Sequence, residues 1–230
     1  MIKAGIQIVR VAEIPWEDRV NVDNWPSRAG MYYDDRENQL CLRLIDYPHG
    51  STEPRHVHAG THATTVLKGR AVVDGLTLAP LDVIIGPGGE PHGPLHYPDG
   101  CKLLSAFQGS YFHSEVQQLS TEKRYRLVQA AMIPWTVSEV NGAQTKTLVD
   151  HGCGRLLEQV LRFAPGARIP ARSEPQTQAV LVVEGTAVIE DETLGVWDFF
   201  RVPGGVEHGP IGFPGGATLL TVTLRNVEAW

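Results

Sequence analysis

The sequence predicts an all-β protein made of two tandem antiparallel barrels of the jelly-roll type. Three observations support this fold class. Apolar and β-branched segments are short, turn residues are abundant, with 24 glycines and 16 prolines among 230 residues, and one pattern of residues occurs twice along the chain. The sequence also lacks the long 3.6-residue periodicity that amphipathic helices show.

The expected strands follow one another through both halves of the chain. Each is rich in β-branched or apolar residues, which fit a half-buried pleated surface, and each is bounded by glycine, proline or aspartate. Repeated short strands of this kind favour an antiparallel barrel in each half. In order, we expect strands at residues 39–45, 63–67, 71–73, 83–85, 102–107, 156–163, 180–183, 186–189, 199–202 and 218–224.

The repeated pattern keeps a constant register. Nine residues of the first half each lie 116 positions before a counterpart: Gly50, His56, His58, His62, Gly69, Asp82, Pro87, Gly89 and His92 correspond to Gly166, Arg172, Glu174, Gln178, Gly185, Asp198, Pro203, Gly205 and His208. Upstream, the segment that ends at Trp16 is repeated by one that ends at Trp135, at an offset of 119. A tandem duplication explains both. We therefore expect domains at residues 1–117 and 118–230, with the polar segment 114–124 as the linker.

Composition and charge exclude several classes of function. A formal net charge of −6 argues against binding to a phosphate backbone. No apolar run approaches the roughly 18 residues that cross a bilayer, and residues 1–16 carry charges at Lys3, Arg10 and Glu13, unlike a secretory signal. Three widely spaced cysteines, Cys41, Cys101 and Cys153, suggest reduced thiols. We expect a cytoplasmic protein without nucleic-acid or membrane partners.

Four histidines of the first repeat have a spacing that predicts a metal site. His56 and His58 alternate on a strand and therefore point to the same face, and residues 59–61 can turn the chain before His62. These three would come from one hairpin. His92 follows a Gly-Gly turn after the apolar run 83–85, where a returning strand can bring it to the same cavity.

These two segments resemble the two sequence motifs of the cupin superfamily, whose members are small β-barrels that usually hold a metal through three histidines and one glutamate. The resemblance implies His56, His58, His62 and His92 as metal ligands and, with the repeat, a two-domain bicupin. His62 stands where the family motif normally has glutamate, as in a minority of small bacterial cupins that use four histidines. Residues 1–117 would form a metal-binding cupin domain and residues 118–230 a degenerate, metal-free one.

The expected cofactor is one divalent transition metal ion per chain: Fe, Mn, Ni, Co or Zn. Four neutral imidazoles leave its positive charge uncompensated, so the site should attract an anionic ligand. An octahedral ion held by four histidines keeps two positions open, enough for a deprotonated substrate and dioxygen, whereas tetrahedral zinc would be closed and structural. The resemblance to cupin dioxygenases implies an oxidoreductase that acts on a small chelating enolate, diketone, phenolate or thiol.

Two other functions remain open. One is a regulatory cupin that senses a metal or an oxidant and holds a protein partner. The other is a metal-dependent isomerase or lyase, which would need a carboxylate such as Glu53 or Glu90 as its base. Either carboxylate could instead orient an imidazole or lie at the surface. Assembly into a homo-oligomer through an exposed strand edge is compatible with all of these functions.

The second repeat keeps the turns and loses the ligands. Arg172 and Glu174 replace the two strand histidines and should face the same interior as an ion pair, capped by Gln178 and His208. No divalent cation would choose this set, because arginine cannot be deprotonated to offer a lone pair. The second-site polar cluster of Arg172, Glu174, Gln178 and His208 is therefore either a structural plug or a pocket in which Arg172 binds an anionic effector.

Overall fold

The computed structural model describes residues 2–3, 5–19, 25–37, 39–115, 124–140, 142–150 and 156–224. Antiparallel β-strands and two 3-10 turns, η1 (Val11–Glu13) and η2 (Ala130–Met132), make up its regular structure. All ten expected strands are present, with ends shifted by at most two residues, so the all-β prediction is confirmed. None of the described residues forms a helix with the length and apolarity that a membrane span needs.

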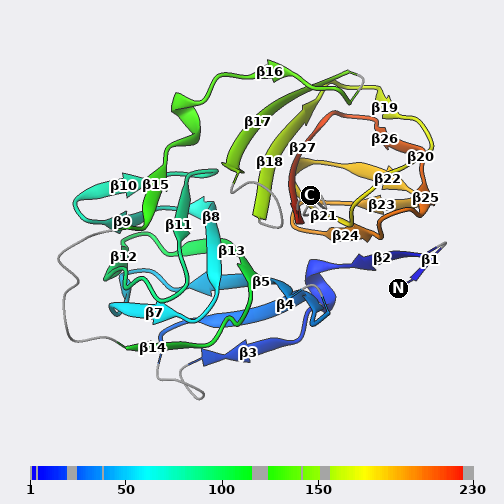
Figure 1. Ribbon diagram of the computed structural model, residues 1–230. Helices are drawn as coiled ribbons and strands as arrows, with labels where there is room; N and C mark the ends of the chain where they lie inside the picture. Colours follow the sequence, from blue (N-terminus) through cyan, green and yellow to red (C-terminus); the bar gives the residue numbers. More distant parts are fainter. Residues whose placement is uncertain are drawn as a thin grey trace, which may run out of the picture. The chain divides into compact units, whose positions relative to one another are not determined.

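The first barrel comprises residues Pro15–Met132 and contains three sheets (Figure 1). The seven-stranded sheet has the order β15 (Arg126–Val128), β11 (Val83–Gly86), β8 (Thr61–Gly69), β13 (Cys101–Gln108), β5 (Leu40–Tyr47), β4 (Arg28–Asp35) and β3 (Trp16–Asp18). The others are a four-stranded sheet of β10 (Leu76–Leu78), β9 (Ala71–Val73), β12 (Leu95–Tyr97) and β6 (Ser51–Glu53), and the pair β14 (His113–Glu115) and β7 (His56–His58).

The second barrel comprises Met1–Ile14 and Ile133–Trp230 and repeats this plan. Its eight-stranded sheet has the order β1 (Ile2–Lys3), β2 (Ile6–Val9), β24 (Phe199–Val202), β21 (Gln178–Gly185), β27 (Ala217–Leu224), β18 (Leu156–Phe163), β17 (Ala143–Asp150) and β16 (Thr136–Val137). A four-stranded sheet of β19 (Ala167–Ile169), β26 (Ile211–Phe213), β22 (Ala187–Ile189) and β23 (Glu192–Leu194) and the pair β20 (Arg172–Ser173) and β25 (Glu207–His208) complete it.

The boundary between the barrels differs from the expected one at residues 117 and 118. Each repeat gives its first strand to the sheet of the other: β2 of the first repeat pairs with β24, and β15 of the second repeat pairs with β11. The receiving strand would otherwise be a sheet edge with unpaired backbone groups. Of the expected linker, Ser114 and Glu115 lie in β14, and residues 116–123 lie outside the described residues.

One buried aspartate in each barrel holds the exchanged segment. The carboxylate of Asp82 accepts hydrogen bonds from the backbone N–H groups of Ala79 (2.9 Å) and Ala130 (2.8 Å). Its counterpart Asp198 accepts them from Gly195 (2.9 Å) and Val11 (2.9 Å), at the equivalent repeat positions. The two repeats have thus kept the same anchor for a segment that enters from the other repeat.

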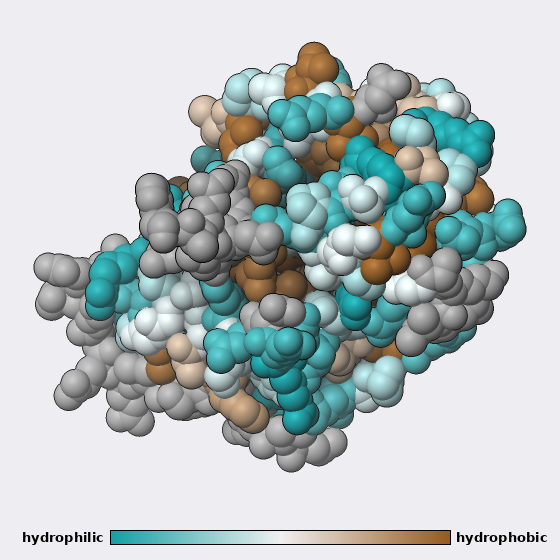
Figure 2. Space-filling view, turned by 45° about the vertical axis from the view of Figure 1, so that its right-hand side comes forward, coloured by the Kyte–Doolittle hydropathy of each residue, from teal (hydrophilic) through white to brown (hydrophobic). Residues whose placement is uncertain are grey.

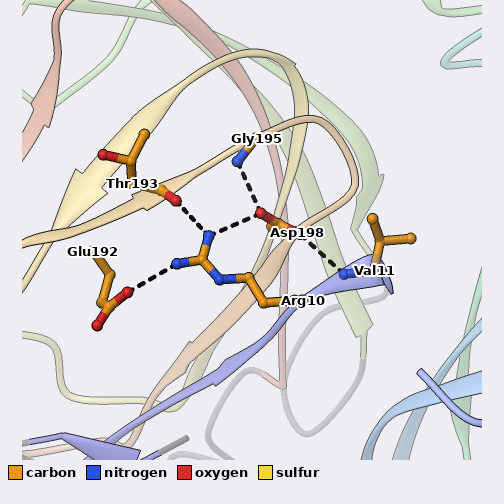
Figure 3. Close-up of polar contacts among 6 residues, drawn as sticks. All are labelled: Arg10, Val11, Glu192, Thr193, Gly195 and Asp198. Atoms are coloured by element: carbon orange, nitrogen blue, oxygen red, sulfur yellow. Dashed lines mark hydrogen bonds and ion pairs between the residues drawn. The ribbon is translucent and has the colours of Figure 1, made fainter. Parts of the chain in front are cut away.

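Arg10 strengthens the anchor of the second barrel (Figure 3). Its guanidinium lies 3.0 Å from the Asp198 carboxylate and 2.9 Å from that of Glu192, and it also donates to the carbonyl oxygen of Thr193. The equivalent position in the second repeat is Gln129, which carries no charge. The N-terminal segment is therefore held by an ion-pair network that the first barrel lacks at this position.

Apolar side chains from the sheets fill both barrels, and hydrophilic residues cover much of the face in Figure 2. Two glycines end the equivalent strands β8 and β21: Gly69 and Gly185 have φ values of +81° and +76°, and a Cβ atom on either would collide with a carbonyl oxygen of Gly100 or Gly216. The thiols of Cys41 and Cys101 are free and buried, and burial raises their pKa to about 12. Cys153 lies outside the described residues.

Arg10→Gln is expected to loosen the N-terminal strand of the second barrel. The substitution removes the charged hydrogen bonds to Asp198 and Glu192, each worth about 1–3 kcal/mol when partly buried. It introduces glutamine, the residue found at the equivalent position of the second repeat. Hydrogen exchange should become faster at the β2 amides that pair with β24, and stay unchanged at the β15 amides in the first barrel. Equal protection of β2 in the variant and the parent would contradict this role of Arg10.

Candidate metal centre

The backbone brings three histidines of the first barrel together. His56 and His58 alternate with Val57 along β7 and are buried, with exposed fractions of 1% and 9%. His92 forms an isolated antiparallel bridge with His56, through two backbone hydrogen bonds of 3.0 and 2.9 Å. The expected return of the chain after β11 therefore delivers His92 directly beside His56.

The expected hairpin for His56, His58 and His62 does not form. Strand β7 pairs with β14, whereas β8, which carries His62 near its start, pairs with β11 and β13. The turn after β7 transfers the chain from the small sheet to the seven-stranded sheet. His62 therefore approaches the other histidines from a different wall of the barrel.

The Nε2 atoms of the histidines converge. His56 Nε2 and His58 Nε2 are 3.0 Å apart, and His62 Nε2 and His92 Nε2 are 3.3 Å apart. One ligand nitrogen from each of His56, His58 and His92 lies within 4.8 Å of the others, a grouping that could hold a metal ion. His62 contacts His92 without joining this group of three, and its role as fourth ligand stays a prediction.

Two histidines are held with their Nε2 lone pairs toward the cluster. His56 Nδ1 lies 2.8 Å from the carbonyl oxygen of Pro54, and His92 Nδ1 lies 3.3 Å from that of Glu90. Because a carbonyl only accepts hydrogen bonds, each Nδ1 must carry the proton, which leaves Nε2 as an acceptor. Lone pairs that face one another at this distance repel unless a proton or a cation lies between them. The donor set thus fits a metal ion.

Burial keeps these imidazoles neutral, as metal ligation requires. Desolvation lowers the pKa of His56 to about 4, against a smaller opposite effect of its hydrogen bond to Pro54. Desolvation, followed by the neighbouring His56, lowers the pKa of His92 to about 4. Burial also holds the pKa of His62 well below its usual value, with smaller contributions from His92 and His56.

A hydrogen-bonded carboxyl group lies under the cluster. Glu53 Oε1 is 3.5 Å from His56 Nε2, and Glu53 Oε2 accepts a hydrogen bond of 2.6 Å from the Tyr97 hydroxyl. Tyr97 in turn stacks on Tyr47, with ring centroids 4.1 Å apart. Burial raises the pKa of Glu53, while the hydrogen bond from Tyr97 lowers it by less.

Glu90, the second carboxylate that the sequence offered as a base, has a structural role. Its side chain is 2% exposed and accepts hydrogen bonds from the backbone N–H of Arg124 (3.0 Å) and from its guanidinium (3.2 Å). Glu90 does not line the cavity around the histidines, whereas Glu53 does. The geometry therefore leaves Glu53 as the carboxyl group that can act there.

The histidines face a cavity of about 40 Å³ inside the first barrel. A single water needs roughly 10–15 Å³, so this cavity exceeds the space for one water. Two aromatic rings contact the imidazoles: Trp25 lies edge-on to His56 at 4.7 Å, and Phe107 lies 5.0 Å from His58. Residues of the seven-stranded sheet and of the adjoining loops line the rest of the cavity: Arg19, Ser27, Ala29, Arg43, Ile45, Thr64, Ile84, Leu103, Ser105 and Tyr111.

The second barrel has a different set of polar groups at the equivalent positions. Arg172 and Glu174 form the expected ion pair, and Arg172 pairs with His208 across the β20–β25 ladder. His208 is 5% exposed, and burial and then Arg172 lower its pKa. Among the described contacts, none joins Gln178 to this pair. Whether the cluster is a plug or an effector pocket stays an open prediction.

Gly86 is a site residue that the motif did not reveal. It pairs with His62 across β11 and β8, and a Cβ atom at this position would collide with the His62 imidazole. In the second barrel the equivalent pair is Val202 and Gln178. A comparison of the two repeats could have found this signal, because glycine occurs opposite His62 in the first repeat and valine occurs opposite Gln178 in the second.

Two kinds of comparison with known proteins agree with this fold. Residues 123–228 match the family model of the ChrR cupin-like domain. The fold is similar to that of a candidate dioxygenase from Nostoc punctiforme, with 13% sequence identity and a TM-score of 0.80 over 98% of this chain and 84% of that one. It is also similar to that of a variant of oxalate decarboxylase from Bacillus subtilis, with 12% identity and a TM-score of 0.67 over 96% of this chain and 78% of that one. A third similar structure is salicylate 1,2-dioxygenase from Pseudaminobacter salicylatoxidans, with 16% identity and a TM-score of 0.63 over 81% of this chain and 71% of that one. No curated protein matches the sequence.

The full-length matches and the buried histidine cluster decide the assignment. The chain has the two-barrel, or bicupin, fold of these similar structures, and residues 123–228 match a cupin-like family model. The family model covers the half of the bicupin that lacks the histidines, whereas the histidine cluster lies in the other half. At these identities the structural likeness establishes the fold, and the reaction has to be argued from the site.

Metal-free bicupin is expected to lose stability as the pH falls from about 6.5 to about 4. Histidines of the unfolded chain bind protons near pH 6.5, whereas His56 and His92 in the folded barrel do so only near pH 4, so the unfolded state takes up more protons in this range. Urea unfolding of chelator-treated protein at several pH values measures the effect. The variant His56→Gln with His92→Gln should show a flatter dependence, and a flat profile in the parent would refute the prediction.

Gly86→Ala is expected to weaken metal binding by about tenfold or more. The new methyl group must displace the His62 ring, so the loss should appear if His62 is the fourth ligand. Competition with a chromophoric chelator gives the affinity. Gly212→Ala is the matched control, because a Cβ atom there meets no neighbour within 4 Å. Unchanged affinity in a folded Gly86→Ala protein would remove His62 from the ligand set.

Proposed function

We propose that the bicupin is a metal-dependent oxidoreductase that uses dioxygen to oxidise a small anionic, chelating substrate in its first barrel. The observation that carries this proposal is the convergence of one ring nitrogen from each of the buried His56, His58 and His92 beside one cavity. Hydrogen bonds at Nδ1 and burial prepare His56 and His92 as neutral metal ligands. Similarity in fold to two proteins described as dioxygenases supports the proposal without proving it.

The residues have distinct tasks in this proposal. His56, His58 and His92, with His62 as the predicted fourth ligand, would hold one divalent transition metal ion, which supplies Lewis-acid and one-electron redox chemistry when bound. The carbonyl oxygen of Pro54 would fix the orientation of His56, and Glu53, which Tyr97 holds by a hydrogen bond, can hold a proton at Oε1 beside the cluster. Trp25 and Phe107 cover the imidazoles with apolar surface and limit the access of water.

The charge of the donor set favours an anionic substrate. All four histidines are neutral ligands, so a divalent ion held by them keeps its full positive charge inside a buried cavity. Burial also raises the pKa of Glu53, whose carboxyl group contacts His56, and this favours the uncharged form of Glu53. A deprotonated chelating group on the substrate would compensate the positive charge of the metal ion, which the neutral histidine ligands leave uncompensated.

A lyase is the second candidate, and Glu53 is the observation that favours it. A buried carboxyl group with a raised pKa beside His56 is suited to deliver a proton to a carbanion that is left after a C–C bond breaks. Oxalate decarboxylase, one of the structurally similar proteins, is described by its name as such an enzyme. Oxygen dependence separates the two candidates, because a lyase reaction consumes no net oxidant.

The proposed function predicts about one transition metal ion per chain and turnover that consumes dioxygen. Elemental analysis of protein purified without added metal gives the first quantity, and a screen of small diketones, phenolates and 2-oxo acids with an oxygen electrode gives the second. His56→Ala with His58→Ala should abolish metal binding, since two of the three converging donors are lost. His96→Ala is the control, because His96 is exposed and hydrogen-bonded to Thr52.

Three results would count against the oxidoreductase. Two ions per chain would mean that the second barrel also binds metal. Full metal content in the double alanine variant would place the ion elsewhere. Equal product formation with and without oxygen would favour the lyase, and loss of that product in Glu53→Gln would support it further.

A further inference from the structure

Arg43 is a buried cation in the wall of the histidine cavity. It lies in the middle of β5, its exposed fraction is 7%, and its side chain lines the same cavity as His56, His58 and His92. Its buried Nε atom has no hydrogen-bond partner within the described part of the chain. Buried guanidinium groups normally have their donors satisfied, so an open donor that faces a cavity indicates a ligand.

The contacts of Arg43 leave it short of negative charge. Its one ion pair is a long one, 3.5 Å from Nη2 to the carboxylate of Glu17, and Arg19 shares that carboxylate at 3.1 Å. Glu17 is also half-exposed, which weakens the pair. The other neighbour is the ring of Tyr111, 4.8 Å away, which holds the guanidinium plane without neutralising it. Burial and then the positive charge of Arg19 lower the pKa of Arg43, as expected for a cation without a full counter-ion.

The sheet register fixes the position of Arg43 relative to the histidines. Arg43 pairs with Ser105 on β13, Ser105 pairs with Thr64 on β8, and His62 is the next inward-facing residue along β8. Ideal strand spacing gives roughly 12 Å between the Cα atoms of Arg43 and His62. Thr64 and Ser105 lie between these two residues in the sheet, and their hydroxyl groups are hydrogen-bonded to each other at 3.0 Å. A small molecule that reaches the histidine cluster with one end can therefore reach the guanidinium with the other.

The second barrel supplies an internal comparison. The position equivalent to Arg43 is Gln159, whose side chain donates a hydrogen bond of 3.1 Å to Thr147. The barrel without histidine ligands thus has a neutral residue here. A purely structural need for a cation at this position of the fold would not explain the difference.

We propose that Arg43 binds a carboxylate group of the substrate, at the opposite end from the chelating group that approaches the histidine cluster. This inference rests on the proposed function, because it concerns the same cavity. It narrows the substrate class from any small chelating anion to a molecule with two functions: a chelating group such as an enolisable diketone, and a separate carboxylate. A guanidinium suits the second function, since its planar donors match the two oxygens of a carboxylate.

The test uses a pair of probes that differ only in the carboxylate. 2,4-Heptanedione carries the chelating diketone alone, and 4,6-dioxoheptanoate carries the same diketone with a carboxylate in place of the terminal methyl group, two methylene groups away from the nearer carbonyl. Binding of each to the cobalt(II)-loaded bicupin is followed through the visible bands of the cobalt ion, without oxygen, so that no turnover is needed. We expect the carboxylate probe to bind about 10- to 100-fold more tightly, the range that one charged hydrogen-bonded contact supplies.

Three variants assign the preference to Arg43. Arg43→Gln introduces the residue found at the equivalent position of the second barrel and should abolish most of the preference for the carboxylate probe. Arg43→Lys should retain only part of this preference, because an ammonium group lacks the planar pair of donors. Arg162→Gln, a change at an exposed arginine of β18 in the second barrel, should leave the preference intact. A preference that survives in folded Arg43→Gln would mean that the added carboxylate binds the metal ion, and would overturn the proposal.

A second measurement is independent of metal. In chelator-treated protein with ¹⁵N-labelled arginine, the Nε–H signal that disappears in Arg43→Lys should shift on titration with acetate and saturate. This outcome supports the inference even if the protein proves to hold no metal, in which case the proposed function fails separately. An Arg43 signal that does not move with acetate, together with equal affinity for the two probes, would refute the inference.

Discussion

The first barrel depends on keeping a group of imidazoles uncharged in a dry interior. Desolvation is the largest effect that opposes their protonation, and the backbone carbonyls of Pro54 and Glu90 decide which nitrogen of His56 and His92 keeps its proton. The result is that the Nε2 lone pairs of His56 and His92 point toward the neighbouring imidazoles, where a proton or a cation has to lie between the nitrogens. Such an arrangement is costly for an empty site and favourable around a cation, which explains why the surrounding elements hold it so closely.

The duplication shows which residues belong to this arrangement, because the second barrel keeps His208, the counterpart of His92, and has other residues at the remaining positions. Beneath the histidines, Glu53, Tyr97 and Tyr47 correspond to Ile169, Phe213 and Phe163, which keep the stacked rings and lose every polar group. The space for His62 at Gly86 is filled by Val202. A hydrogen-bonded carboxyl group without a cluster to serve would be an unsatisfied buried polar group, so the loss of one favours the loss of the others.

The parts common to both barrels serve the fold. Asp82 and Asp198 each bind a backbone N–H of a segment from the other repeat, and the exchanged strands β2 and β15 cover equivalent sheet edges. A chain duplicated in this way joins its repeats through backbone pairing as well as through the connecting segment. The first barrel is thus completed by β15, a strand that begins the second repeat in sequence.

The sequence alone determined the features that depend on neighbours in the chain: the all-β class, the ten principal strands, the register of the repeat, and the shared face of His56 and His58, since alternation along a strand is local. Tertiary structure decided the partners of each strand and the surroundings of each buried polar group. Only contacts between distant segments pair β7 with β14, turn Glu53 toward the cavity and Glu90 away from it, and bring Arg43 to face the histidines. Pairing partners and cavity walls are set by the competition of many segments for the same interior, and no local pattern encodes that outcome.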